Sequence, residues 1–127
     1  MYLNELIEAI NRLYEDLFPL NEMSNYHGEE LNLPVNIWID GPRNLQHGKR
    51  IKFQNNYSTK FDETNLITLT LSDNPTLGKT FKRVKVKSKD IEKIKKWILL
   101  NKDVLEDYAN GNLSTRELDT KLKPYED

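Results

Sequence analysis

The sequence contains no cysteine and only two histidines. Without cysteine the chain can form no disulfide, no thiolate zinc site and no cysteine nucleophile. Chemistry would have to use histidine, carboxylate, hydroxyl or lysine groups. The sequence also lacks a His-x-x-x-His motif and the spaced aspartates of a calcium loop. We therefore expect no metal site and no cofactor.

Long apolar runs are missing too, since none approaches the roughly 20 residues that span a bilayer. The first ten residues, MYLNELIEAI, carry carboxylates where a secretory signal carries cations. We therefore expect a cytoplasmic protein with no membrane partner. Its 127 residues, 37% hydrophobic and 31% charged, suit a single folded domain over residues 1–127 with one core.

Charge is unevenly distributed along the chain, although the net charge is only −1. Residues 1–46 hold two Lys/Arg and eight Asp/Glu (net −6), residues 47–101 hold thirteen and five (net +8), and residues 102–127 hold four and seven (net −3). This pattern is typical of a protein that offers a basic surface to a polyanion. It is equally typical of a chain whose segments neutralise each other on folding.

Hydrophobic periodicity predicts an α+β fold that begins with a helix over residues 1–18, ended by Pro19. Its apolar face repeats at the 3- and 4-residue spacing of a helix and comprises Leu3, Leu6, Ile7, Ile10, Leu13, Tyr14 and Leu17. Residues 20–34 show no sustained period and contain Gly28 and Pro34. We expect them to form a loop.

Residues 35–87 alternate with a period of two, which predicts a mainly antiparallel sheet of about four strands. The expected strands lie near residues 35–40, 50–54, 66–71 and 81–87. Polar or Gly/Pro-containing turns separate them.

Residues 88–123 predict helices. Ser88 is expected to cap the first helix, which should end near the Asn-Gly pair at residue 110. Asn101 lies on the apolar stripe, and we expect it to project at the edge of the stripe rather than to recap the chain after a kink. Residues 114–117, STRE, form a capping-box pattern that begins a short last helix.

The segment SKDIEKIKKWILLNKDVL resembles the C-terminal helix of a small bacterial domain family of unknown function, often found beside toxin–antitoxin partners. The shared pattern, a Ser-initiated helix with W-[IV]-x-x-N-x-x-x-L, matches Ser88, Ile91, Trp97, Ile98, Asn101 and Leu105. The family's P-P-H-x-H stretch is absent, and only His47 in RNLQHGKRIKFQ stands near its place. The segments LPVNIWIDG, HGKRIKFQ and DNP are similar to short proteins of bacterial genomes and their phages. These resemblances imply a protein of mobile-element or phage type without supplying a function.

His47 is the best candidate for catalysis, because it follows Asp40 closely and lies near Lys49 and Arg50. A hairpin that joined His47 to Asp40 would make a weak RNase-like site. The alternative is that His47 is a solvated turn residue. We favour this alternative and expect no catalytic residue, since a single histidine in a polar turn carries little specificity.

If the apolar residues of every strand face the helices, the opposite face of the sheet is basic and carries an exposed indole. Its expected binding residues are Trp38, Arg50, Lys52, Arg83, Lys85 and Lys87. Such a face can bind single-stranded nucleic acid by phosphate pairing and base stacking, or an acidic protein surface. The alternative is a solvated face whose lysines guard against aggregation. Trp38 argues against that alternative, unless the loop over residues 20–34 covers it.

The function expected from these features is binding without catalysis. The expected partner is nucleic acid or a nucleic-acid-handling protein such as a host defence nuclease, which the protein would inhibit. One alternative is a toxin–antitoxin component with or without weak RNase activity at His47. Another is a structural or oligomerising module without a polyanion partner.

Overall fold

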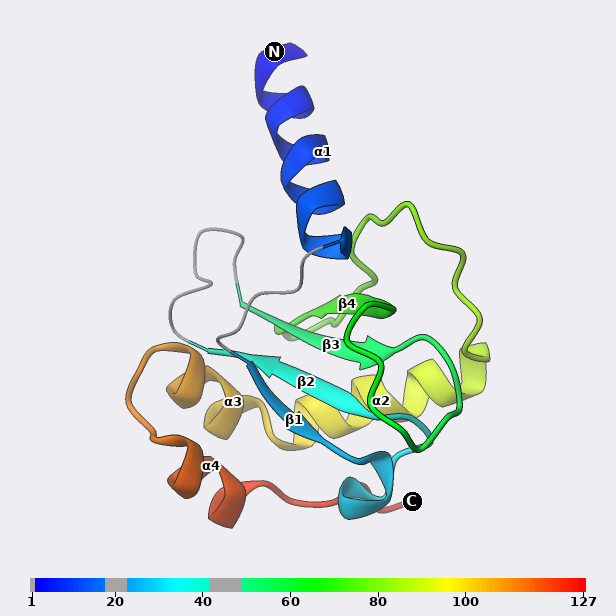
Figure 1. Ribbon diagram of the computed structural model, residues 1–127. Coiled ribbons are helices and arrows are strands. Elements are labelled where there is room, and N and C mark those ends of the chain that lie inside the picture. The colour runs from blue at the N-terminus through cyan, green and yellow to red at the C-terminus, as the bar shows by residue number, and fades with distance from the viewer. Residues whose placement is uncertain (1, 18–22, 42–48) are drawn as a thin grey trace.

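The computed structural model describes residues 2–17, 23–41 and 49–127. Its fold is α+β, as the sequence predicts, with a helix before an antiparallel sheet and helices after it (Figure 1). Along the chain the elements are α1 (Tyr2–Leu17), β1 (Met23–Tyr26), the 3₁₀ helix η1 (Gly28–Leu31), β2 (Ile37–Asp40), β3 (Arg50–Gln54), β4 (Leu66–Thr70), α2 (Ser88–Leu100), α3 (Lys102–Ala109) and α4 (Thr115–Lys121). The expected helix stop at Pro19 lies outside the described residues.

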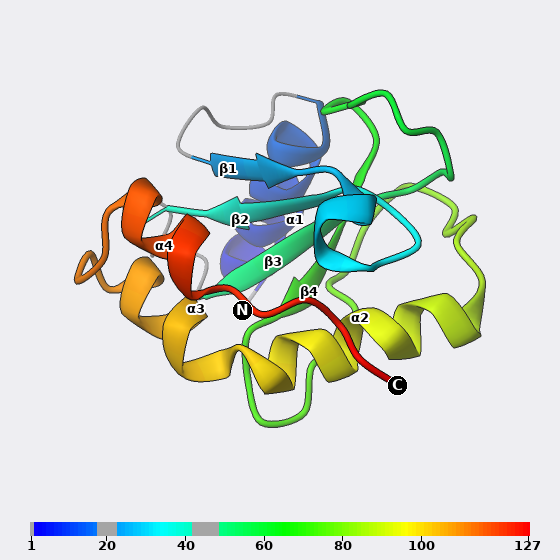
Figure 2. The ribbon, with the colours of Figure 1, turned by 90° about the horizontal axis from the view of Figure 1, so that it is seen from below.

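The strands form an antiparallel meander in the order β1-β2-β3-β4. Helices α2, α3 and α4 lie on one side of this sheet, and α1 projects from the other side (Figures 1 and 2). The strand register places Ile39 opposite Ile51, and Ile51 opposite Leu69. Residues of this parity therefore share one face of the sheet, and that face packs against the helices.

The hydrophobic core lies between this apolar face and the helices α2, α3 and α4. The sheet contributes Ile37, Ile39, Ile51, Phe53, Ile67 and Leu69, and the helices contribute Ile94, Trp97, Ile98, Leu105 and Leu118. Trp97 is fully buried, and its indole nitrogen donates a hydrogen bond to the carbonyl of Lys123 at 2.9 Å. Each large side chain in this core contributes about 1.5–3 kcal/mol by leaving water.

Asn101 divides the long helix that the periodicity predicts into α2 and α3. Its amide nitrogen donates to the carbonyls of Trp97 and Lys123, both at 3.0 Å, and its side-chain oxygen accepts from the Lys123 amide at 2.8 Å. The expectation that Asn101 projects at the edge of the stripe is therefore wrong. The residue is buried because its carboxamide satisfies the backbone at the helix break and holds the C-terminal tail.

The end of α3 and the start of α4 agree with the predictions from the sequence. Gly111 has a left-handed backbone (φ 80°) just after the end of α3, which is the conformation that glycine favours. At the start of α4, the Glu117 amide donates to the Ser114 hydroxyl, and the Glu117 carboxylate accepts from the Ser114 amide, both at 3.1 Å. This is the predicted capping box.

The first strand lies within residues 20–34, where we expected a loop. The short polar sequence MSNY of β1 carries no alternation signal, yet it pairs antiparallel with β2. Its side chains are held by the C-terminal helices: the Ser24 hydroxyl bonds the Tyr108 hydroxyl at 2.9 Å, and the Tyr26 hydroxyl donates to Asp119. The strand therefore depends on tertiary contacts that a local pattern does not report.

Residues 81–87 do not form the predicted fourth strand. The outer edge of β4 is occupied by the chain just before them: the Thr70 amide donates to the Thr76 carbonyl at 2.9 Å, and the Gly78 amide donates to the Thr68 carbonyl at 2.8 Å. A strand over 81–87 that extended the sheet beyond β4 would need that same edge. The segment instead runs as an irregular connection to α2 (Figure 1).

Candidate polyanion-binding surface

The six expected binding residues fall into two groups with different environments. Three of them are buried in the protein: Trp38, Arg50 and Lys52 expose 2%, 9% and 3% of their surface. The other three, in residues 83–87, are exposed. The expectation of one open basic sheet face is therefore wrong for its β2 and β3 residues.

Trp38 is covered by the connection between β3 and β4. The ring of Phe61 meets the indole edge to face, with centroids 5.3 Å apart, and the same ring stacks on His27 at 4.0 Å. At the end of β3, the buried Gln54 amide donates to the carbonyls of Ser58 and Lys60 in that connection. These contacts hold the connection over the sheet, so Trp38 has no exposed face on which a base can stack.

Arg50 and Lys52 both form ion pairs with Asp40 inside the protein. The Arg50 Nε lies 2.6 Å from Asp40 Oδ2, and the Lys52 Nζ lies 3.5 Å from Asp40 Oδ1. All three side chains are buried. Two cations of the basic middle of the sequence therefore pair with an acid of the N-terminal segment inside the fold. This agrees, for these residues, with the interpretation that the charged segments neutralise each other on folding.

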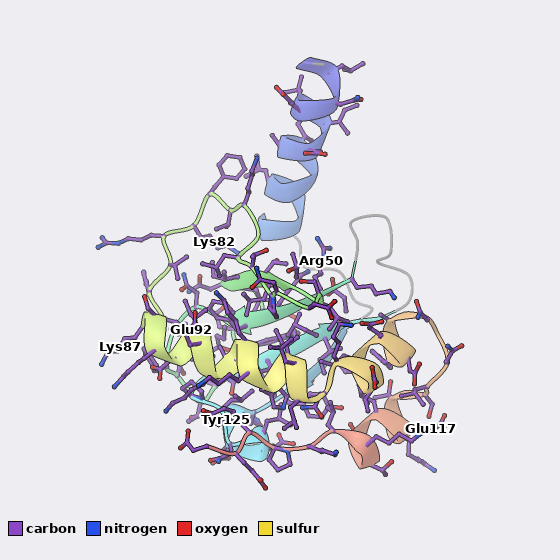
Figure 3. All side chains as sticks on the ribbon, turned by 180° about the vertical axis from the view of Figure 1, so that it is seen from behind. Arg50, Lys82, Lys87, Glu92, Glu117 and Tyr125 are labelled. Atoms are coloured by element: carbon purple, nitrogen blue, oxygen red, sulfur yellow. The ribbon has the colours of Figure 1, made fainter. Side chains whose placement is uncertain are left out.

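The three exposed binding residues belong to a longer basic segment, residues 79–89, which we call the cationic strip. This segment contains six Lys/Arg and no Asp or Glu. Its exposed cations are Lys79, Arg83, Lys85, Lys87 and Lys89. The segment runs from beside the lower end of α1, near the labelled Lys82, to the labelled Lys87 at the start of α2 (Figure 3). Five of its six cations are therefore exposed along one connecting segment.

Asn55 holds the middle of the strip in place. Its amide nitrogen donates to the Arg83 carbonyl at 2.6 Å, and its side-chain oxygen accepts from the Lys85 amide at 2.7 Å. Val84 is partly buried and Val86 is buried, while the cations that alternate with them are exposed. The predicted alternation of valines inward and cations outward is therefore present, although a side chain replaces the partner strand.

Tyr57 holds the end of the strip where α2 begins. Its hydroxyl accepts from the Lys87 amide at 2.9 Å and donates to the Asp90 carboxylate at 2.7 Å. In a capping box the third helical residue accepts the N-cap amide directly, whereas here a tyrosine hydroxyl bridges the two groups. The N-cap is Lys87, so the expected Ser88 cap is wrong.

The pKa of Tyr57 is raised above its ordinary value. Desolvation is the main cause, and the hydrogen bond to Asp90 acts in the same direction, while the bond from the Lys87 amide opposes them. The hydroxyl therefore stays protonated at neutral pH. Only the protonated hydroxyl can donate to Asp90, so the bridge at the start of α2 is intact there.

Phe81 is an aromatic residue that the sequence reasoning did not count as a binding residue. It lies inside the cationic strip and exposes 67% of its surface. Tyr57, at the other end of the strip, is also exposed. An exposed aromatic residue within a run of cations is a pattern typical of surfaces on which bases stack, and the sequence shows this pattern at Phe81.

In residues 2–17, 23–41 and 49–127, no three His, Asp or Glu side chains lie close enough together to hold a metal ion. His47 lies outside these ranges, and Asp40, its suggested partner, is paired with Arg50 and Lys52. Among the helices described, none has the length and apolar character to cross a membrane.

The class that the structure defines is an α+β protein built on a four-stranded antiparallel meander. Comparison of the chain with known protein families, with curated proteins and with solved structures finds no match.

Proposed function

We propose that the protein binds single-stranded nucleic acid through the cationic strip. The observation that carries the proposal is the charge of residues 79–89, six cations without an acid, of which five are exposed. The nearest following acid, Asp90, is buried and bonded to Tyr57. A polyanion on this segment would release counterions as its phosphates pair with the exposed cations.

The exposed aromatic residue favours a single strand over a duplex. Unpaired bases have open faces that stack on aromatic side chains, whereas the bases of a duplex stack on each other. Phe81 stands among the cations of the strip, so a phosphate backbone that follows Arg83 and Lys85 would have a base within reach of its ring. Asn55 and Tyr57 hold the backbone of the strip, which reduces the entropy lost on binding.

The proposed activity is binding without catalysis. Asp40, which would have to orient His47 in an RNase-like site, is buried in ion pairs with Arg50 and Lys52. The origin of the protein in a mobile element or phage, and inhibition of a nuclease, stay predictions.

Fluorescence anisotropy with a labelled oligothymidylate or oligouridylate of about 20 nucleotides, longer than one binding site, tests the proposal. Binding constants are measured between about 50 and 200 mM salt. The triple variant Arg83→Gln/Lys85→Gln/Lys87→Gln should bind more weakly. The slope of log K against log salt should fall in magnitude by about 2, because each lost phosphate contact removes about 0.7.

The matched control removes the same charge elsewhere. Arg116, Lys121 and Lys123 are exposed cations of α4 and the segment after it. Changing all three to Gln should leave the salt slope as it is in the wild type. Absence of oligonucleotide binding by the wild type, or equal losses in both triple variants, would refute the proposal. If the strip binds polyglutamate but no oligonucleotide, its partner is an acidic protein.

A further inference from the structure

Helix α1 presents an exposed apolar face. Five of its Leu and Ile side chains expose between 43% and 67% of their surface: Leu3, Leu6, Ile7, Ile10 and Leu13. The helix stands away from the sheet, on the side opposite α2, and its N-terminal end is remote from the rest of the protein (Figures 1 and 3). This is the face that the sequence marks by its 3- and 4-residue spacing. Such faces are stable when another apolar surface covers them.

The spacing within this face matches a helix-pairing seam. Leu3 and Ile10 occupy the first position of a seven-residue repeat, and Leu6 and Leu13 occupy the fourth. Glu5 and Glu8 are exposed and fall at the third and sixth positions, away from the seam. Two copies of this helix can therefore pair without bringing these carboxylates together. A basic partner helix is less suitable, because it would find no acid within the seam to pair with.

The length of α1 also argues for a partner. It has 16 residues, just above the length of about 12–15 residues below which isolated helices are marginal in water, and most helical stability in proteins comes from packing of an amphipathic face. Pairing with a second copy would remove on the order of 1,000 Å² of surface, near the lower limit for specific interfaces. That area suits a reversible dimer.

We propose that α1 is a dimerisation helix that pairs antiparallel with α1 of a second copy. The antiparallel arrangement follows from the position of the cationic strip, which passes beside the lower end of α1 near the labelled Lys82 (Figure 3). Parallel helices would bring two such basic surfaces together. Antiparallel helices place them at opposite ends of a helix pair about 24 Å long. This inference does not depend on the proposed nucleic-acid binding.

Sedimentation equilibrium over a broad range of protein concentration tests the dimer without any oligonucleotide. The wild type should dimerise reversibly, and Ile10→Glu, which introduces a charge into the seam, should weaken dimerisation about tenfold or more. The matched control Asn4→Glu adds the same charge outside the seam, where the Asn4 side chain is exposed, and should change the dissociation constant little. The urea midpoint of dilute protein should be similar in all three, because the Asn4 and Ile10 side chains are exposed.

Orientation can be measured by disulfide trapping, because the chain has no cysteine of its own. An antiparallel pair places residue 3 of one copy near residue 13 of the other. A mixture of Leu3→Cys and Leu13→Cys proteins should therefore form mixed disulfides, and Leu3→Cys alone should form few. A monomeric wild type, or an oligomer that Ile10→Glu leaves intact, would overturn the dimer. Efficient cross-linking of Leu3→Cys with itself would overturn the antiparallel arrangement.

Discussion

The cations of β3 and those of the cationic strip alternate with apolar residues in the same way, but their environments are opposite. Arg50 and Lys52 are buried and share the carboxylate of Asp40. The alternating cations of residues 83–87 are exposed on a segment that contains no acid. The first group is part of the folded interior, and the second is available to a partner.

This difference arises from what lies opposite each group. The β3 cations sit in the middle of a sheet whose second face is covered by the connection carrying Phe61, so their charge needs an internal counter-ion. The strip lies outside the sheet, because residues 76–78 already occupy the edge of β4. Alternation reports which residues share a side, and the opposing segments decide whether that side faces water.

The largest effect is expected from removing the counter-ion of the buried group. Asp40→Ala would remove a buried carboxylate that pairs with two buried cations and should destabilise the protein by about 3–5 kcal/mol. Urea unfolding measures this loss. The control is Asp73→Ala, which removes an exposed carboxylate 3.0 Å from Lys102 and should cost less than about 1 kcal/mol. Equal losses in the two variants would show that the Asp40 cluster is solvated.

The next largest effects are expected from two aromatic residues, one of which should change stability and the other oligonucleotide affinity. Trp38→Ala should lower stability by about 3 kcal/mol, because it leaves a cavity beneath Phe61. Phe81→Ala should instead lower oligonucleotide affinity by about 1–3 kcal/mol while leaving the salt slope unchanged, since stacking involves no counterion release. Affinity lost through Trp38→Ala in a fully folded variant would restore the sheet face as the binding surface.

A smaller effect is expected where the strip joins α2. Tyr57→Phe keeps the ring and removes the hydroxyl between the Lys87 amide and Asp90, which should cost about 1–3 kcal/mol and speed amide exchange in the first turn of α2. Because the folded pKa of Tyr57 is raised, its contribution is present below the ordinary value of 10.0 and is lost as pH rises above it. The difference in stability between wild type and Tyr57→Phe should therefore shrink above pH 10. A constant difference would place the hydroxyl outside the bridge.

The smallest effect on stability is expected from the strip itself. Arg83→Gln/Lys85→Gln/Lys87→Gln should shift the free energy of unfolding by less than about 0.5 kcal/mol, because these side chains are exposed. Lys52→Gln should be more harmful than all three changes together, since it leaves Asp40 with one cation fewer. A triple variant that is clearly destabilised would mean that the strip is structural.

The sequence by itself determined the features that rest on local chemistry. Helical spacing predicted α1 and the burial of Trp97. The sequence of residues 114–117 predicted the capping box of α4, and period-two alternation predicted β2, β3 and β4. Each of these depends on groups a few residues apart, whose geometry a helix or strand repeats along the chain. The fold class could be predicted for the same reason.

Only the tertiary structure decided which surfaces are open to a partner. Local pattern could not show that β1 would occupy one edge of the sheet, that residues 76–78 would occupy the other, or that Phe61 would cover Trp38. It could not place the apolar face of α1 away from the core. Burial is decided by segments remote in sequence, and charge, hydrophobicity and period are the same for a residue whether such a segment covers it or not.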